Sequence, residues 1–178
     1  MASPQPIPPW LRTVFGLPRH LYANHLGWLL GHRFLQLDHT GRRTGRDYHT
    51  VLEVMRYDPA RREAVVMSGF GAGADWLRNI QASGHATVQI GRMGYPAQFR
   101  ILPPDEAETV LAGYERRNRL IRPVLHAVLS RLLGWPYDAT TPARRRAVDQ
   151  LPLLAFTPRG PDTGPGPGRA GRSGTAAR

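Results

Sequence analysis

An arginine-rich loop is the part of the sequence best suited to binding chemistry. Residues 40–46 read Thr-Gly-Arg-Arg-Thr-Gly-Arg and join two segments that we predict to be strands. Glycine lets backbone N–H groups approach an anion closely, and arginine offers paired hydrogen bonds to phosphate oxygens. The loop is therefore predicted to hold a phosphate group. A solvated hairpin turn is the competing interpretation, and the residue types alone do not decide between the two.

A second stretch, residues 68–79 (SGFGAGADWLRN), places a glycine-rich loop directly before a predicted helix. A helix N-terminus attracts anions, and the indole of Trp76 offers a flat face to a ring system. The stretch also matches the dinucleotide fingerprint G-x-G-x-x-A, but that fingerprint needs an acidic residue about twenty positions further on. The next acidic residue is Asp105, so a Rossmann site is not predicted. A purely structural interpretation, with Trp76 in the core, stays open.

Composition excludes several other kinds of site. The chain has no cysteine, and all of its basic residues are arginine, which excludes thiolate chemistry, a P-loop lysine and a Schiff-base lysine. Its seven histidines form no H-E-x-x-H motif, so no metal site is predicted, and His49 is the one histidine beside a candidate loop. No G-x-S-x-G motif is present either. Any redox or transfer chemistry is thus expected to come from a cofactor.

The net charge of +11 indicates an anionic partner, which could be nucleic acid, anionic lipid or a phosphorylated cofactor. Nucleic acid is not expected, because the chain has no recognisable recognition helix or aromatic RNA platform. Basic amphipathic helices in residues 111–133 could touch a membrane, although an ordinary surface helix is the preferred interpretation. No long apolar run or export signal is found, so we expect a cytoplasmic protein, with peripheral membrane contact left open.

Short alternating and β-branched runs predict a mainly antiparallel α+β barrel with helical additions. The expected strands are residues 34–39, 48–57, 63–68, 86–90, 95–102 and 153–157. The expected helices are residues 75–83, 104–117 and 120–133 and a last one from Thr141, with Asp75 and Thr141 as N-caps and Gly84 as a stop. Residues 10–32 have helical spacing interrupted by Pro18.

The ends of the chain differ in composition from its body. Residues 1–8 are expected to be a flexible N-terminus, residues 9–158 one cofactor-binding domain, and residues 159–178 a disordered tail. The tail is rich in Gly, Pro and Arg and has no large apolar residue, so it cannot offset the entropy of ordering.

Taken together, these segments resemble the deazaflavin-dependent nitroreductase family. The resemblance runs from about Leu17 to Pro158 through TGRRTGR, HTVLEV, VVMSGFGAGADWLRNIQA, VQIGR, YERRN, LGWPYD and LPLLAFTP. It implies a split β-barrel with peripheral helices, related to the FMN-binding split barrels. It also implies coenzyme F-420, an anionic 8-hydroxy-5-deazaflavin, and hydride transfer from its reduced form to a quinone, nitro compound or enone.

The resemblance also assigns site residues by position. Arg42, Arg43 and Thr44 would hold the phosphate-side tail of the coenzyme, with Tyr48, His49, Thr50 and Val51 on the strand beside it. Ser68, Gly69, Asp75, Trp76, Leu77, Arg78 and Asn79 would frame the deazaflavin ring and its linker. The chain departs from the family at Asp47-Tyr48, where Pro-Arg is frequent, and at Gly69, where a basic residue is frequent. No catalytic side chain is assigned; Tyr114 and Tyr137 are candidates for the substrate side.

Two other functions remain open from the sequence. The barrel could bind FMN or haem instead, as related barrels do, or the chain could be a non-catalytic basic module for nucleic acid or membranes. The physiological small-molecule acceptor and the choice between monomer and homodimer are not predicted.

Overall fold

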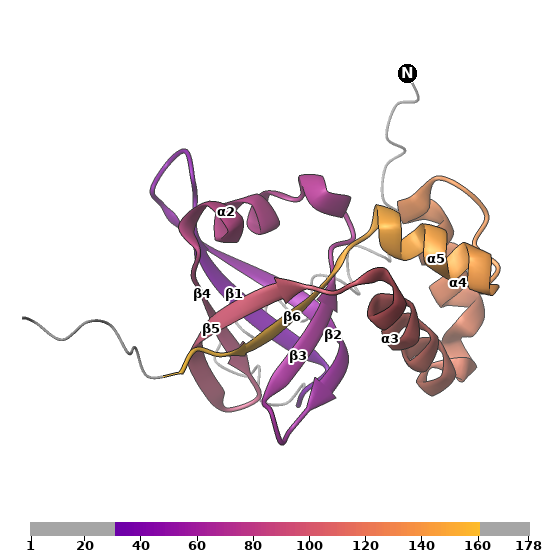
Figure 1. Cartoon of the computed structure of the whole chain (residues 1–178), viewed down its shortest axis with the longest axis horizontal. Coiled ribbons are helices and arrows are strands. Elements are labelled where there is room, and N and C mark those ends of the chain that lie inside the picture. Colours follow the sequence, from indigo (N-terminus) through magenta and orange to yellow (C-terminus); the bar gives the residue numbers. More distant parts are fainter. Residues whose placement is uncertain (1–30, 161–178) are drawn as a thin grey trace, which may run out of the picture.

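The computed structural model describes residues 31–160, in which six strands form a closed antiparallel barrel (Figure 1). The strand order around the barrel is β1-β2-β3-β6-β5-β4. The strands are β1 (Phe34–Thr40), β2 (Asp47–Asp58), β3 (Glu63–Met67), β4 (Ala86–Ile90), β5 (Met93–Ile101) and β6 (Leu153–Pro158). The expected barrel of mainly antiparallel strands is confirmed.

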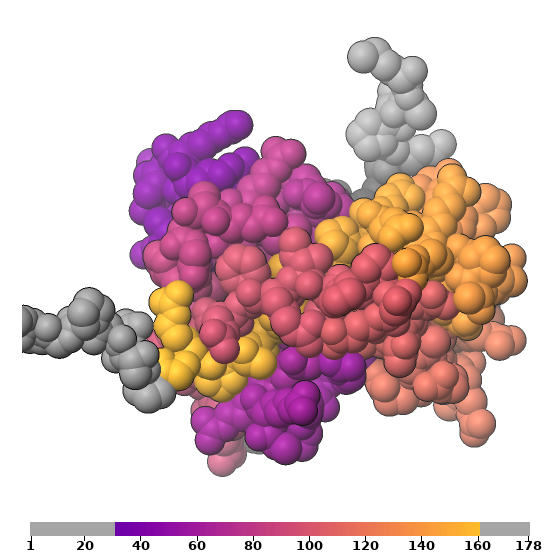
Figure 2. All heavy atoms as spheres, viewed as in Figure 1, coloured from indigo at the N-terminus to yellow at the C-terminus, as the bar shows by residue number. Residues whose placement is uncertain are grey.

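Four α-helices and two short 3-10 helices accompany the barrel in the described residues. The α-helices are α2 (Asp75–Ser83), α3 (Pro104–Arg117), α4 (Arg122–Leu133) and α5 (Thr141–Gln150), and the 3-10 helices are η2 (Gly71–Gly73) and η3 (Arg119–Ile121). Helix α2 lies at one end of the barrel, whereas α3, α4 and α5 gather at its side (Figure 1). In the space-filling view α4 and α5 lie at the right of the molecule, on the side away from the β1–β2 loop (Figure 2). The helices are peripheral, as expected.

The alternating sequence of strand β1 decides which of its side chains face the barrel interior. Leu35, Leu37 and His39 are buried, while the residues between them are only partly covered. Because side chains that face each other across paired strands share one face, the register Leu37↔Thr50 and His39↔Tyr48 places the Thr50 and Tyr48 side chains on the inner face. His49 pairs with Asp38 and lies on the outer face.

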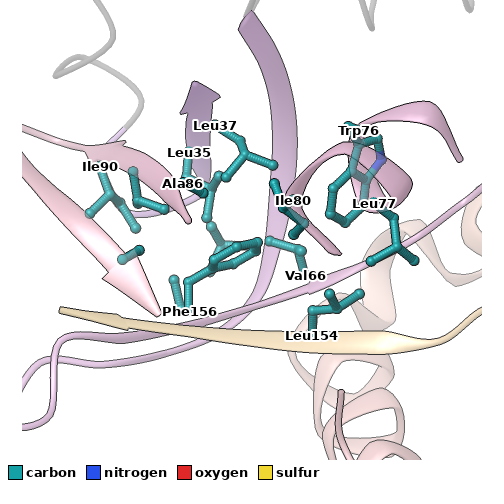
Figure 3. Close-up of a cluster of buried hydrophobic side chains, with 14 of the residues drawn as sticks. Leu35, Leu37, Val66, Trp76, Leu77, Ile80, Ala86, Ile90, Leu154 and Phe156 are labelled. Atoms are coloured by element: carbon teal, nitrogen blue, oxygen red, sulfur yellow. The ribbon is translucent and has the colours of Figure 1, made fainter. Parts of the chain in front are cut away.

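Helix α2 seals its end of the barrel with apolar side chains (Figure 3). Trp76, Leu77 and Ile80 are buried at helical spacing on one face of α2. The helix ends at Gly84, whose φ of 71° is a left-handed conformation that glycine adopts without a Cβ clash. The core under α2 includes Leu37, Val66, Leu154 and Phe156. The position of α2, and with it the glycine loop before it, is therefore fixed by the barrel interior.

Strands β3 and β6 are buried on both faces, which explains their continuous apolar sequences. Val66 packs into the barrel interior, whereas Val65 faces a second core that includes Leu111, Leu129 and Leu153. This second core joins α3, α4 and α5 to the outside of the barrel.

Some predicted boundaries were wrong. The N-cap of α2 is Ala74, because Asp75 is already the first helical residue, where its carboxylate still complements the helix dipole. The N-cap of α5 is Thr140, whose hydroxyl accepts a hydrogen bond from the backbone N–H of Ala143. Helix α4 begins at Arg122, after the 3-10 turn η3, and β5 begins at Met93 rather than Tyr95.

Predictions about the chain ends lie outside the described residues. These are the predicted flexible N-terminus at residues 1–8, the predicted helical spacing of residues 10–32 as far as residue 30, and the predicted tail 159–178 from residue 161 onward. The domain limits 9–158 stay a prediction. Among residues 31–160, no helix is long and apolar enough to cross a membrane, and no group of three or more histidine or acidic side chains could hold a metal ion.

An ion-pair cluster ties β2, β3 and β5 to α3. Arg56 lies 2.7 Å from the buried Glu63 and 3.2 Å from Glu106, and Arg100 lies 2.7 Å from Glu106 and 3.4 Å from Glu63. The hydrogen bond from Arg100 is the main cause that lowers the pKa of Glu106 from its usual 4.5 to about 2. The cluster favours the charged form of Glu106 in the folded state.

Acid is therefore expected to weaken the fold through Glu106. Its pKa is lower when folded, so its stabilisation is present above pH 4.5 and is lost as the pH falls towards about 2. We expect about 1–2 kcal/mol of this pH-dependent stability to be absent in Glu106→Gln, since partial exposure screens the pair. Urea unfolding of the wild type and of Glu106→Gln between pH 7 and pH 2.5 measures this difference in stability, with Glu108→Gln as the control variant. Equal pH dependence in wild type and Glu106→Gln would contradict the assignment.

Candidate cofactor site

A cleft of about 640 Å³ lies between the β1–β2 loop, the start of β2 and the N-terminal half of α2. In Figure 1 the loop and α2 stand at the same end of the barrel. The lining residues are His39, Gly41, Arg42, Arg43, Thr44, Tyr48, His49, Thr50, Phe70, Gly73, Ala74, Asp75, Trp76 and Asn79. The two loops singled out in the sequence thus share one cleft.

The arginine-rich loop is a compact turn that needs its glycines. The Gly41 carbonyl accepts hydrogen bonds from the N–H groups of Thr44 and Gly45, at 3.2 and 2.8 Å. Gly45 has a φ of +65°, which favours glycine. A Cβ on Gly41 would lie 2.6 Å from the Tyr48 ring, so a side chain there would displace the ring from the cleft wall.

Arg42 connects this loop to α2. Its backbone N–H and its guanidinium both donate to the Asn79 side-chain oxygen, at 3.2 and 2.8 Å. The guanidinium also pairs with the Asp75 carboxylate at 3.0 Å. The Arg42 side chain is 21% exposed and that of Asp75 is 84% exposed, so the pair lies at the edge of the cleft. Arg42 therefore holds the loop against the helix.

Arg43 is placed differently. It lines the cleft, is exposed, and makes no hydrogen bond or ion pair with any other residue in the described part of the chain. A guanidinium with five unused donors beside a glycine turn is well suited to an anionic ligand. Of the two central arginines, Arg43 is the one available to bind.

His39 lies beneath the cleft, where it links β1, β2 and α2. Its Nδ1 is 3.2 Å from the Asn79 side-chain nitrogen, and its Nε2 is 3.0 Å from the Thr50 hydroxyl. Its ring stacks against Tyr48 with 5.9 Å between centroids. Burial is the largest influence and lowers the pKa of His39; the neighbouring Asp38 opposes this, and His49 adds to it.

The structure brings together nine of the fourteen cofactor-binding residues expected from the sequence. Those lining the cleft are Arg42, Arg43, Thr44, Tyr48, His49, Thr50, Asp75, Trp76 and Asn79. His49 borders the cleft from the outer face of β2, where its Nδ1 lies 2.7 Å from Asp38.

The other five expected residues do not line the cleft. Val51 pairs with Gln36 on the outer face, Leu77 is fully buried in the core, and Arg78 is exposed on the surface of α2. Ser68 donates to the Gly71 carbonyl at 2.6 Å, and Gly69 faces Leu132 of α4. Ser68 and Gly69 therefore shape the glycine loop from behind.

Five lining residues were not among the fourteen assigned ones: His39, Gly41, Phe70, Gly73 and Ala74. Four of them lie in the two loop stretches predicted to bind, and only His39 lies outside both. His39 could have been found, because it continues the alternation of Leu35 and Leu37 on the inner face of β1. Phe70 carried a weaker indication, as a large apolar residue inside a glycine loop. It is 79% exposed, whereas Trp76, the predicted ring contact, is 7% exposed and packs mainly in the core.

Tyr114 and Tyr137 lie away from the cleft. The Tyr114 hydroxyl donates to Glu53 at 2.7 Å, and the Tyr137 hydroxyl donates to the buried Glu115. Burial is the main cause that raises the pKa of both phenols. The structure does not bring these two side chains to the site.

A family profile described as F420H(2)-dependent quinone reductase matches residues 10–120, which is well over half of the chain. The chain belongs to this quinone reductase family. The resemblance seen in the sequence is thereby confirmed. The matched residues include both loops of the cleft.

Solved structures similar to this quinone reductase family member are distant. An F420-H2 dependent reductase, FDR-A, has 14% identity and a TM-score of 0.43 over 70% of this chain and 93% of that one. An FMN-binding protein from Nostoc punctiforme has 16% identity and a TM-score of 0.40, over 85% and 81%. The haem storage protein HutZ from Vibrio cholerae has 10% identity and a TM-score of 0.46, over 79% and 92%. No curated protein matches.

Proposed function

We propose that this protein binds coenzyme F-420 in the cleft and transfers hydride from its reduced form to a quinone. The observation that carries the proposal is the cleft itself, which Arg43 borders together with the aromatic residues Phe70 and Trp76. The Arg43 guanidinium has no partner within residues 31–160. An anionic tail and a flat ring system require these two kinds of surface.

The residues present fit such a coenzyme. Arg43, with Thr44 and the glycine turn, would hold the anionic tail, and Arg42 would keep the turn in place. Phe70, Ala74 and Trp76 would flank the ring at the α2 end of the cleft. The volume of about 640 Å³ lies within the range of cofactor clefts, roughly 300–1,000 Å³.

When bound, the reduced deazaflavin supplies a hydride from its C5 position. The protein's part is to position the two reactants and exclude water, which needs no side-chain acid. This agrees with the engaged hydroxyls of Tyr114 and Tyr137. Nitro compounds and enones remain further acceptors predicted from the resemblance.

The test is turnover of the reduced coenzyme with a simple naphthoquinone, followed by reappearance of the absorbance of the oxidised coenzyme. Nitroaromatic and enone acceptors are run in parallel, and reduced FMN replaces the reductant in a control. Quinone-dependent oxidation that requires the deazaflavin supports the proposal. Absence of turnover with every acceptor, or activity with FMN alone, refutes it.

Haem iron would need an accessible axial ligand. Both ring nitrogens of His39 are hydrogen-bonded, so His39 does not supply one. His49 pairs with Asp38 through Nδ1 and is exposed, so it is the cleft histidine that a haem would use. FMN stays the runner-up cofactor.

We also propose a peripheral membrane contact at the start of α4. Leu120 is 91% exposed, and Ile121 and Val124 are also exposed beside Arg119 and Arg122. Residues 116–137 contain five arginines and no acidic residue, a composition that favours anionic lipid. Co-sedimentation with phosphatidylglycerol vesicles tests it, and equal binding by a Leu120→Ser, Val124→Ser variant would refute it. The cytoplasmic location stays a prediction, and neither monomer nor homodimer is assigned.

A further inference from the structure

Beneath the cleft, a series of hydrogen bonds runs from Arg42 through Asn79 and His39 to Thr50, and the donor of each bond can be identified. The backbone N–H and the guanidinium of Arg42 are donors only, and both reach the same Asn79 atom. That atom must therefore be the amide oxygen, which fixes the orientation of the Asn79 side chain. The Asn79 amide nitrogen, a donor, then faces His39.

His39 continues this series of hydrogen bonds from Asn79 to Thr50. Since Asn79 donates, the Nδ1 atom of His39 has to accept, at 3.2 Å. A neutral imidazole with an accepting Nδ1 carries its proton on Nε2. Burial, which lowers the pKa of His39, also favours the neutral ring. The Nε2–H group therefore donates to the Thr50 hydroxyl oxygen at 3.0 Å.

Thr50 is the end of this series and lines the cleft. Its oxygen accepts from His39, so its own hydroxyl hydrogen has to find an acceptor elsewhere. No acceptor for it exists within residues 31–160. The inner-face position opposite Leu37 places the half-buried side chain under the cleft rather than in bulk solvent.

We propose that Thr50 is a preset hydrogen-bond donor for the bound cofactor, oriented by Arg42, Asn79 and His39. Its partner is an uncharged acceptor, a carbonyl oxygen or an unprotonated ring nitrogen. The inference rests on the proposed function, because it concerns a ligand in the same cleft. Under this inference the two arginines have different roles. Arg43 contacts the anionic part of the ligand, and Arg42 is a positioning residue.

The tautomer is tested first, without any cofactor. Long-range ¹H–¹⁵N correlation spectra of the full-length protein, labelled at histidine nitrogens, distinguish the two neutral forms. His39 is assigned by comparison with His39→Gln. We expect the Nε2–H form at pH 7.5. The Nδ1–H form, or a charged ring, would overturn the inference.

The donor is tested by binding of oxidised coenzyme F-420. We expect Thr50→Val to lower the affinity about five- to tenfold, the effect of one lost hydrogen bond, whereas Thr50→Ser stays within about twofold of wild type. Thr87→Val, on β4 outside the cleft, is the matched control. Unchanged affinity in Thr50→Val refutes the inference even though the wild type binds. Failure of the wild type to bind would instead refute the proposed function.

The positioning role of His39 is tested by non-additivity. His39→Leu removes the donor to Thr50, so it should cause a loss similar to that of Thr50→Val, and the double variant should lose no more than either alone. His39→Gln, whose amide can both accept and donate, should recover part of the affinity. Additive losses would indicate that His39 acts only through the fold. They would overturn the inference that His39 orients the Thr50 hydroxyl.

Discussion

Replacing Arg43 with alanine is expected to lower the affinity for coenzyme F-420 by about 10- to 100-fold, since charge-assisted hydrogen bonds are worth about 1.5–3 kcal/mol. The Arg43 side chain makes no hydrogen bond or ion pair within residues 31–160, so all of its N–H donors are available to the ligand. The stability of the fold should hardly change, because the side chain is exposed. The double variant Arg42→Ala, Arg43→Ala should bind more weakly still, since it also releases the loop from α2.

The matched control is Arg61→Ala, at the β2–β3 turn. It removes the same charge at an exposed position that does not line the cleft. Fluorescence titration at two salt concentrations then separates a local contact from general attraction by a basic protein. Equal losses in Arg43→Ala and Arg61→Ala would mean that net charge, not the loop, governs binding.

Trp76→Ala is expected to reduce the free energy of unfolding by about 3–5 kcal/mol, the usual cost of removing a buried aromatic side chain. Trp76 is 7% exposed and packs with Leu77 and Ile80 against the barrel interior (Figure 3). Phe70→Ala should change stability by less than about 0.5 kcal/mol, because Phe70 is 79% exposed. Phe70→Ala should nevertheless weaken coenzyme binding several-fold, as an aromatic contact is worth about 0.5–1.5 kcal/mol.

Urea unfolding and coenzyme titration of both variants separate the two roles. Phe70→Leu, which keeps an apolar side chain but no ring, tells stacking from apolar burial. A stable Trp76→Ala protein that has lost binding would reverse the assignment. It would restore Trp76 as mainly a ligand contact, as the sequence first indicated.

Local sequence was sufficient for most of the secondary structure. Helices α2 and α3 were predicted with their observed bounds because proline, glycine and charge mark their ends. The N-cap of α2 was misassigned by one position, because Asp75 is already the first helical residue. Its carboxylate pairs with Arg42, 33 positions away in the sequence. A long-range partner of this kind leaves no local pattern.

The candidate site was predicted only in part, because the pairing of strands decides which of its side chains face inward. A continuous run from Tyr48 to Val51 was assigned to the cofactor, but a strand points successive side chains to opposite faces. The pairing with β1 decides which face is inward, and it places Thr50 inside and Val51 outside. His39, which precedes the arginine loop, was passed over because its partners Asn79 and Thr50 come from two other elements.

Titration of the purified protein with oxidised coenzyme F-420 and, in parallel, with FMN tests the central claim most directly. Cofactor fluorescence is followed at low and moderate salt. The account predicts saturable binding of the deazaflavin that persists at moderate salt, with weaker binding of FMN. Preference for FMN, or no saturable binding of either cofactor, would contradict it.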